Sequence, residues 1–281
     1  MKKITRRSFL AAAGLSVAAL ALTACGGSSS STASSVASSA AASSAAASSS
    51  AAAAELTTVE AGKLTMATNA AFPPYEMTTD AGDFEGIDVE TAQAIADKLG
   101  LELQIDDMDF DAALLSVQQG KADIVMAGVT VTDERKNVMD FSNSYATGIQ
   151  SIIVPEGSDI ASPDDLAGKK IGTQRGTTGY IYCSDDFGDD AVVAYDDGLT
   201  AVQALSNGQV DAVVIDNAPA KEFVAANPGL VILDTSYAEE DYAIGMAKGN
   251  TALEDAVNAA LEELKADGTL QSIVDKYIVA E

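Results

Sequence analysis

Histidine is absent from the 281 residues, and this absence weakens the case for most catalytic sites. The side chain that most often moves protons near neutral pH is therefore missing. The sequence also lacks a Gly-x-Ser-x-Gly elbow, a phosphate loop ending in Gly-Lys-Ser or Gly-Lys-Thr, and zinc-ligand spacing. We expect no enzyme activity, no metal and no cofactor, although acid-base chemistry by carboxylates stays open.

Basic residues are scarce, at 16 against 42 acidic ones. Because four of the basic residues and none of the acidic ones precede Cys25, the remainder carries a net charge of −30. Such an acidic surface argues against binding to nucleic acid and against docking on anionic lipid. Beyond Cys25 the only cysteine is Cys183, which excludes an intrachain disulfide there and predicts a buried or semi-buried small side chain.

Residues 1–25 have the pattern of a signal peptide rather than of a spanning helix. Lys2, Lys3, Arg6 and Arg7 precede a short, Ala-rich apolar run, which ends in Leu-Thr-Ala-Cys25. That ending resembles the bacterial lipobox, in which the cysteine is acylated and becomes the new N-terminus. The run Thr-Arg-Arg-Ser-Phe-Leu also resembles a twin-arginine signal, so the export route stays open between the general and twin-arginine pathways.

Residues 26–58 are almost entirely serine and alanine. A segment with so few large apolar side chains cannot bury enough surface to fold alone, and its many serines disfavour an alanine-rich helix. We expect a flexible tether that holds a folded part close to the membrane surface. A lipid anchor at Cys25 would place that part on the extracytoplasmic face.

From residue 60 onward, short apolar runs alternate with helical patterns. Residues 63–68 predict a strand, residues 88–99 an amphipathic helix stopped by Gly100, and residues 101–105 a second strand. Such alternation is typical of α/β folds with helices on both faces of a sheet.

One βα element occurs twice. A helical stretch leads into Gly120-Lys-Ala-Asp123 and an apolar run, and 88 residues later another leads into Gly208-Gln-Val-Asp211 and an apolar run. Residues 170–173 further resemble the opening strand at residues 63–68. Chance similarity of two βα units is the alternative, but we expect two lobes of similar construction.

Ligands of open α/β sheets bind at the carboxyl ends of strands. Four predicted strands end near Asn69, Gly128, Gln174 and Asp216, so two facing lobes would bring these residues to one cleft. Helices are expected at residues 251–266 and 269–278, separated by Gly268.

Several motifs, in order, resemble the polar amino-acid solute-binding proteins of ATP-binding-cassette importers (bacterial extracellular solute-binding proteins, family 3). They cover residues 60–281, and each is modest alone. They are Thr68-Asn-Ala-Ala-Phe-Pro-Pro-Tyr75, Gly86-Ile-Asp-Val-Glu90, Gly120 through Arg135, Met139-Asp-Phe-Ser142, Gly176-Thr-Thr-Gly179 and Gly268-Thr-Leu270.

This resemblance implies a two-lobed periplasmic-binding-protein fold of type II, with the ligand cleft between the lobes. Lobe 1 would comprise residues 59–144 and 245–281, and lobe 2 residues 150–239. The two crossover segments, residues 145–149 and 240–244, would form a hinge. The implied protein is an extracytoplasmic monomer that binds a free, polar amino acid and delivers it to an importer permease.

The resemblance also assigns the site. Arg135 would pair with the α-carboxylate, helped by backbone and hydroxyl donors at Gly128, Thr130 and Thr178. Asp216 would bind the α-ammonium. The plain alternatives are a surface arginine on a helix for Arg135 and a helix N-cap for Asp216.

Phe72 and Phe110 would pack against the ligand's side chain, unless they are plain core residues. Asn69 replaces an aspartate found in relatives that bind basic or amide side chains, which weakens the case for a cationic ligand. Gln174 and Arg175 are further polar candidates.

Two other readings compete with transport. A dehydratase-like enzyme shares the fold, and a ligand sensor would signal through a partner protein. The acids Asp107, Asp109 and Asp111 resemble the start of a calcium loop, but Ala112 stands where glycine is needed and Gln118 where the closing glutamate is needed. We interpret them as a solvated turn.

Overall fold

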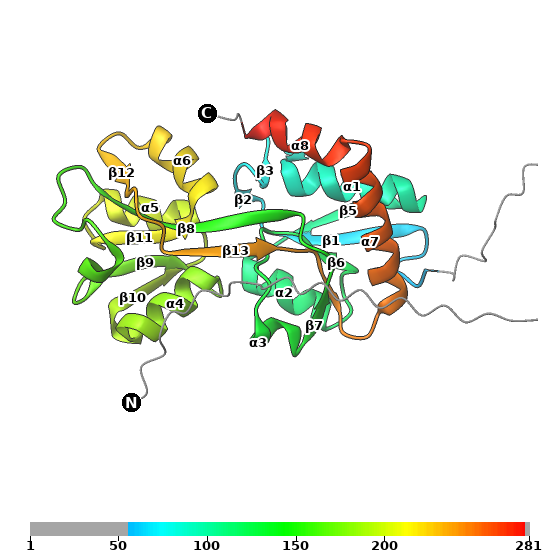
Figure 1. Cartoon of the computed structure of the whole chain (residues 1–281), viewed down its shortest axis with the longest axis horizontal. Helices are drawn as coiled ribbons and strands as arrows, with labels where there is room; N and C mark the ends of the chain where they lie inside the picture. Colours follow the sequence, from blue (N-terminus) through cyan, green and yellow to red (C-terminus); the bar gives the residue numbers. More distant parts are fainter. Residues whose placement is uncertain (1–55, 279–281) are drawn as a thin grey trace, which may run out of the picture. The chain divides into compact units, whose positions relative to one another are not determined.

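A computed structural model describes residues 56–278 of the chain. The predicted signal peptide, Cys25 and the tether up to residue 55 lie outside the described residues. Within them the chain builds two mixed sheets with helices on both faces, and a small third sheet (Figure 1). No helix among the described residues is long and apolar enough to cross a membrane.

The first sheet has the strand order β5-β1-β6-β14-β7. Its strands are β1 (Lys63–Thr68), β5 (Glu102–Asp107), β6 (Ile124–Val125), β7 (Met139–Phe141) and β14 (Gly245–Ala247). The pairs β1–β5 and β1–β6 are parallel, while β14 runs antiparallel to both of its neighbours. A small sheet, β2-β3-β4, follows β1 and consists of β2 (Ala71–Phe72), β3 (Glu76–Thr78) and β4 (Phe84–Glu85).

Side chains of the first sheet alternate between two apolar layers, as strand geometry requires. Met66 and Ile124 pack with three helices, whereas Ala67 and Val125 face a fourth, α2 (Phe110–Gln118). The three helices on the first face are α1 (Ile87–Leu99), α7 (Thr251–Ala266) and α8 (Thr269–Tyr277). A short helix, α3 (Asp133–Lys136), precedes β7.

The second sheet has the order β10-β9-β11-β8-β12, with β13 also paired to β8. Its strands are β8 (Ala146–Pro155), β9 (Ile171–Gln174), β10 (Val192–Tyr195), β11 (Ala212–Asp216), β12 (Leu230–Ile232) and β13 (Ala238–Tyr242). Its helices are α4 (Thr178–Phe187), α5 (Gly198–Ser206) and α6 (Asn217–Ala226), with 3₁₀ turns at Pro163–Leu166 and Asp189–Ala191. Val213 and Ile215 pack with α5 and α6, while Val214 joins Cys183 of α4 in a separate cluster.

The repeated aspartates do the same structural work in both sheets. The Asp123 carboxylate accepts a 2.8 Å hydrogen bond from the backbone N–H of Thr65 in β1. The Asp211 carboxylate accepts a 2.7 Å bond from the N–H of Lys170, just before β9. The glycines that precede them, Gly120 and Gly208, have φ of 66° and 67°, which explains why glycine recurs after each helix. The predicted duplication is therefore present as two equivalent units.

The two lobes are connected by paired strands rather than by loops. β8 and β13 run antiparallel from Ala146 opposite Tyr242 to Gln150 opposite Ala238, side by side in Figure 1. The N–H of Ala243 donates to the carbonyl of Val129, which ties this ribbon to the first lobe. The predicted crossovers at residues 145–149 and 240–244 fall mostly within this ribbon, which the sequence pattern did not reveal as a strand pair.

Candidate functional site: a buried cavity between two sheets

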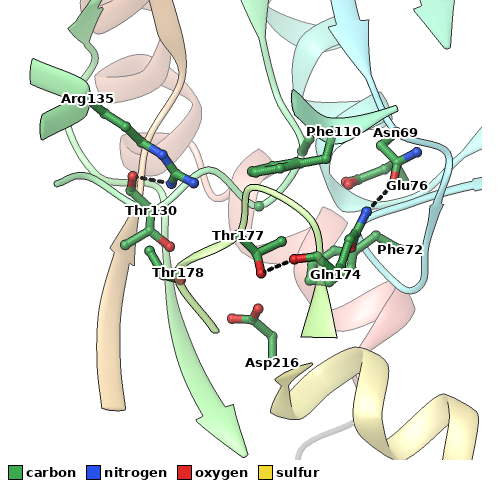
Figure 2. Close-up of a pocket in the computed structure, with 12 residues that line it drawn as sticks. Asn69, Phe72, Glu76, Phe110, Thr130, Arg135, Gln174, Thr177, Thr178 and Asp216 are labelled. Atoms are coloured by element: carbon green, nitrogen blue, oxygen red, sulfur yellow. Dashed lines mark hydrogen bonds between the residues drawn. The ribbon is translucent and has the colours of Figure 1, made fainter. Parts of the chain in front are cut away.

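One cavity gathers side chains from the carboxyl ends of strands in both lobes. It is lined by Asn69, Phe72, Glu76, Phe110, Ala127, Gly128, Thr130, Arg135, Gln174, Thr177, Thr178 and Asp216. All nine residues predicted as ligand contacts are among these twelve (Figure 2). The free space within it is only about 10 Å³, about the size needed for one water molecule. An amino acid therefore requires the walls to separate before it can enter.

Contacts across the cavity hold its walls together. A guanidinium nitrogen of Arg135 donates to the carbonyl of Gly176 at 3.1 Å. The amide of Gln174 donates to the side-chain oxygen of Asn69 at 2.9 Å. Gly176 lies so close to α2 that a Cβ there would stand 3.2 Å from the Cβ of Asp111. Residues of the second lobe thus close directly on the first.

Arg135 lies in α3 and is buried, with 8% of its surface exposed. The Thr132 hydroxyl caps this short helix by accepting from the backbone N–H of Arg135. The guanidinium donates to the Thr130 carbonyl at 2.8 Å and stacks on the Phe110 ring at 5.4 Å. Among the described residues, no carboxylate lies within ion-pair distance of it. Burial lowers the pKa of Arg135, and this buried cation still has free N–H groups for an anion.

Asp216 ends β11 and directly precedes α6, so it occupies the N-cap position of that helix. Its side chain makes no cap hydrogen bond. The carboxylate instead accepts a short hydrogen bond from the Tyr242 hydroxyl and one of 2.8 Å from the Gln150 amide. Burial raises the pKa of Asp216 to about 7, and the charge of Glu240 contributes to the rise. The carboxylate is held in the cavity wall rather than used to cap the helix.

The N-terminus of α4 supplies further donors. Thr177 caps the helix by accepting from the N–H of Tyr180. The first N–H groups of a helix have no carbonyl partner within it and attract anions. Thr178, the first residue of α4, lines the cavity. An anion can therefore be bound jointly by Arg135 and by this helix end.

Glu76 was not predicted from the sequence, yet its side chain is fully buried in the cavity wall. Its carboxyl oxygens make no hydrogen bond of good geometry among the described residues, and the side chain that interacts with them is that of Asp88. Burial and the charge of Asp88 raise the pKa of Glu76 well above its ordinary value. No sequence signal marks it, because a lone glutamate after Pro-Pro-Tyr has no distinctive spacing.

The N–H of Gly128, which was predicted to bind the ligand's carboxylate, is already hydrogen-bonded to Asp88. The Asp88 carboxylate accepts from the Gly128 N–H at 3.0 Å and from the Tyr145 hydroxyl at 2.7 Å. Gly128 has φ of 55°, and a Cβ there would lie 2.9 Å from the Phe72 ring, so glycine is required. With its N–H engaged, Gly128 offers a ligand its carbonyl rather than a donor. Burial raises the pKa of Asp88 to about 6.

Other predicted residues take mixed positions. Phe72 and Phe110 are buried and belong to the hydrophobic core as well as to the cavity wall. Arg175 does not line the cavity. Its side chain is half exposed, and its guanidinium lies 3.5 Å from the Asp196 carboxylate. Cys183 is buried, as expected. Among the described residues, no cluster of potential metal ligands was found.

Comparison with known proteins places this arrangement in context. Residues 64–280 match the family described as bacterial extracellular solute-binding proteins, family 3. The L-cystine-binding protein TcyJ of Escherichia coli (strain K12) is 34% identical over 226 residues, which cover 79% of this chain and 85% of that protein. The putative ABC transporter arginine-binding protein 2 of the same strain is 32% identical over 227 residues, covering 79% of this chain and 93% of that protein.

The fold is also similar to solved structures. An ancestral arginine-binding protein bound to glutamine superposes with a TM-score of 0.74 at 41% sequence identity. The match covers 78% of this chain and 99% of that one.

Proposed function

Because the chain belongs to the bacterial extracellular solute-binding proteins, family 3, we propose that it captures a free amino acid in the cavity and delivers it to an ABC-type importer. The observation that carries this proposal is the pair of opposite charges in one cavity wall. Arg135 and Asp216 are both buried and come from different lobes, and neither forms an ion pair with the other. An α-amino acid carries the two charges that match them.

The other end of the cavity suggests a side chain rich in hydrogen-bond donors. Asn69 is neutral and its amide oxygen already accepts from Gln174, while the fully buried Glu76, whose pKa is raised by burial and by the charge of Asp88, adds carboxyl oxygens to the wall. A carboxyl oxygen accepts hydrogen bonds in either protonation state, so a ligand's guanidinium or amide can donate to Glu76. The related proteins named for arginine, and the one bound to glutamine, support this ligand class.

A thermal-shift screen tests the proposal. The chain that begins after Cys25 would be purified and heated with each common L-amino acid and with L-cystine. A ligand at a hundredfold excess over its Kd stabilises the folded state by about 2.7 kcal/mol. We expect L-arginine or L-glutamine to give the largest shift, while no shift with any amino acid would refute the proposal.

We further propose that the protein acts as a lipid-anchored monomer outside the cytoplasmic membrane. The leader that ends in Leu-Thr-Ala-Cys25, followed by the Ser/Ala-rich segment, supports an anchored and tethered form. Mass spectrometry of the native N-terminus tests this, with a diacylated Cys25 as the expected first residue. Cleavage elsewhere, or an unmodified Cys25, would contradict the anchor without affecting the binding site.

A further inference from the structure

Glu240 lies behind the cavity wall, on the linking strand β13. It shares the buried face of that strand with Tyr242 and is only 7% exposed. One carboxylate oxygen, Oε2, accepts three hydrogen bonds. The donors are Thr178 Oγ1 at 2.9 Å, Gln150 Nε2 at 3.0 Å and Thr130 Oγ1 at 3.1 Å. Glu240 thus contacts both lobes and the partner linking strand at once.

These bonds determine what the two threonines can offer a ligand. A hydroxyl has one proton and two lone pairs. Because an ionised carboxylate can only accept hydrogen bonds, Thr130 and Thr178 each donate their hydroxyl proton to Glu240 in a hydrogen bond. Both residues line the cavity, and their hydroxyls can then present only lone pairs to a ligand. They become acceptors, not the anion donors that the sequence resemblance implied.

The groups nearby have the same character. The Gly128 N–H is taken by Asp88, which leaves its carbonyl. Gln150 bridges Glu240 and Asp216 by donating to both, at 3.0 Å and 2.8 Å. Asp216 is itself an acceptor that lines the cavity. This part of the wall therefore combines a carboxylate with hydroxyl and carbonyl acceptors, whereas Arg135 and the start of α4 provide the donors.

We propose that Glu240 is a positioning residue: it accepts hydrogen bonds from the hydroxyl protons of Thr130 and Thr178, so that both hydroxyls can only accept hydrogen bonds from a ligand. The cavity then selects a ligand with an α-amine over one with an α-hydroxyl. This inference rests on the proposed amino-acid function and deepens it. An α-ammonium brings three donors to Asp216 and the two hydroxyl oxygens, whereas an α-hydroxyl brings only one. Glu240 does not line the cavity itself and acts through the two threonines.

Glu240 also supports the donor end of the site. Burial lowers the pKa of the Arg135 guanidinium, and the charge of Glu240 opposes that shift. Loss of the Glu240 charge is therefore expected to weaken carboxylate binding for every ligand to a similar degree. The ratio of the affinities for the α-amino and the α-hydroxy ligand isolates the effect on the threonines. The weaker carboxylate binding affects both ligands equally and so cancels in this ratio.

The test compares L-arginine with argininic acid, its α-hydroxy analogue, by isothermal titration of the full chain after Cys25. If the wild type binds L-glutamine rather than L-arginine, L-glutamine and its α-hydroxy analogue replace this pair. Glu240→Met has no acceptor and releases both hydroxyl protons, so the ratio of the two affinities should fall about tenfold or more. Glu240→Gln keeps an acceptor oxygen, so most of the ratio should remain. Glu239→Met, on the exposed face of the same strand, is the matched control.

Thr130 provides a second route if Glu240→Met does not fold. Thr130→Val removes one acceptor and should lower the ratio, while Thr130→Ser should stay closer to the wild-type ratio. An unchanged ratio in folded Glu240→Met, or in Thr130→Val, would overturn the positioning role and leave Glu240 a structural residue. A wild type that binds the amino acid and its hydroxy analogue equally well would also overturn it. A wild type that binds no amino acid would refute the proposed function instead.

Discussion

The Gln174 amide of one lobe donates to the Asn69 side-chain oxygen of the other across 2.9 Å, and both residues are buried in the cavity wall. Asn69 in turn donates to the carbonyl of Met108 at 3.0 Å. This relay fixes the orientation of both amides, so that the Asn69 oxygen faces Gln174. In the closed arrangement, these bonds organise the end of the cavity near Glu76.

Asn69→Asp is predicted to shift selectivity toward cationic side chains. Aspartate can still accept from Gln174, and it adds a negative charge near the ligand's side chain. We expect the ratio of L-arginine to L-glutamine affinity to rise about tenfold, as one buried charge contact of about 1.4 kcal/mol would give. Competition titrations measure the ratio, with the exposed Asn207→Asp as control. An unchanged ratio would remove Asn69 from the specificity determinants.

Arg135→Ala and Asp216→Ala are each predicted to weaken amino-acid binding by about 30-fold or more. Truncating one member of a desolvated charge pair costs roughly 2–5 kcal/mol, much of it from the partner left unpaired. A ligand whose carboxylate is amidated should bind wild type and Arg135→Ala with similar affinity. A ligand whose amine is N-acetylated should likewise bind wild type and Asp216→Ala with similar affinity. Isothermal titration measures both, with the half-exposed Arg175→Ala as control. Tight binding of the N-acetyl form to wild type would contradict the role of Asp216.

Acidic pH is predicted to weaken binding. The pKa of Asp216 is about 7, so the carboxylate becomes protonated as pH falls below that value and loses its attraction for an ammonium. Binding near pH 7 should therefore release protons. Titrations in buffers of different ionisation enthalpy measure this release, which Asp216→Asn should diminish and the exposed Asp189→Asn should not. Affinity that is constant from pH 5 to pH 8 would show that Asp216 does not bind the amine.

Without ligand, the stability of the protein is predicted to fall as pH rises. The folded-state pKa of Asp216 lies above the unfolded value of 3.8, so the folded state binds more protons between about pH 4 and pH 7. Its contribution to stability is fully present below that window and is lost as pH rises through it. Asp88, with a pKa of about 6, acts in the same direction. Thermal unfolding across this range should show a slope that becomes shallower in Asp216→Asn.

Ligand binding is predicted to close the two lobes in solution. A cavity of about 10 Å³ cannot admit an amino acid unless the lobes first separate, with the β8–β13 ribbon as the connection between them. A ligand that contacts both lobes then favours the closed arrangement. Small-angle scattering should show a smaller radius of gyration at saturation. Superimposable curves, at a concentration where titration proves saturation, would rule out a hinge.

The sequence predicted the elements with strong local signals. The helix at Thr251–Ala266 was predicted with the same bounds, and that at Ile87–Leu99 to within one residue, since apolar periodicity and a terminal glycine mark both. The apolar run after Asp123 forms a strand of only two residues, Ile124–Val125. An apolar run does not show where the hydrogen bonds to the neighbouring strands end, so its length overestimates the strand.

The site was predictable only where residues belong to a recognisable motif. All nine predicted contacts line one cavity, and several of them end a strand or begin a helix, such as Asp216 at the end of β11 and Thr178 at the start of α4. The sequence analysis missed Glu76, Asp88 and Glu240. The chain has 42 acidic residues, and the sequence alone does not distinguish the few buried ones from the many exposed ones. Their importance depends on burial and partners that are distant in sequence, such as Thr130 and Glu240, which lie 110 residues apart.

The position of β14 constrains the order in which the protein can be completed. This strand, Gly245–Ala247, lies between β6 and β7 in the interior of the first sheet, although it is the last strand along the described part of the chain. Every residue of the second lobe therefore leaves the ribosome before the first sheet can acquire its missing interior strand. The second lobe has all its strands by Tyr242 and can mature while its neighbour is still unfinished. A nascent chain stalled before residue 245 should thus contain a protected second lobe and a first lobe open to protease.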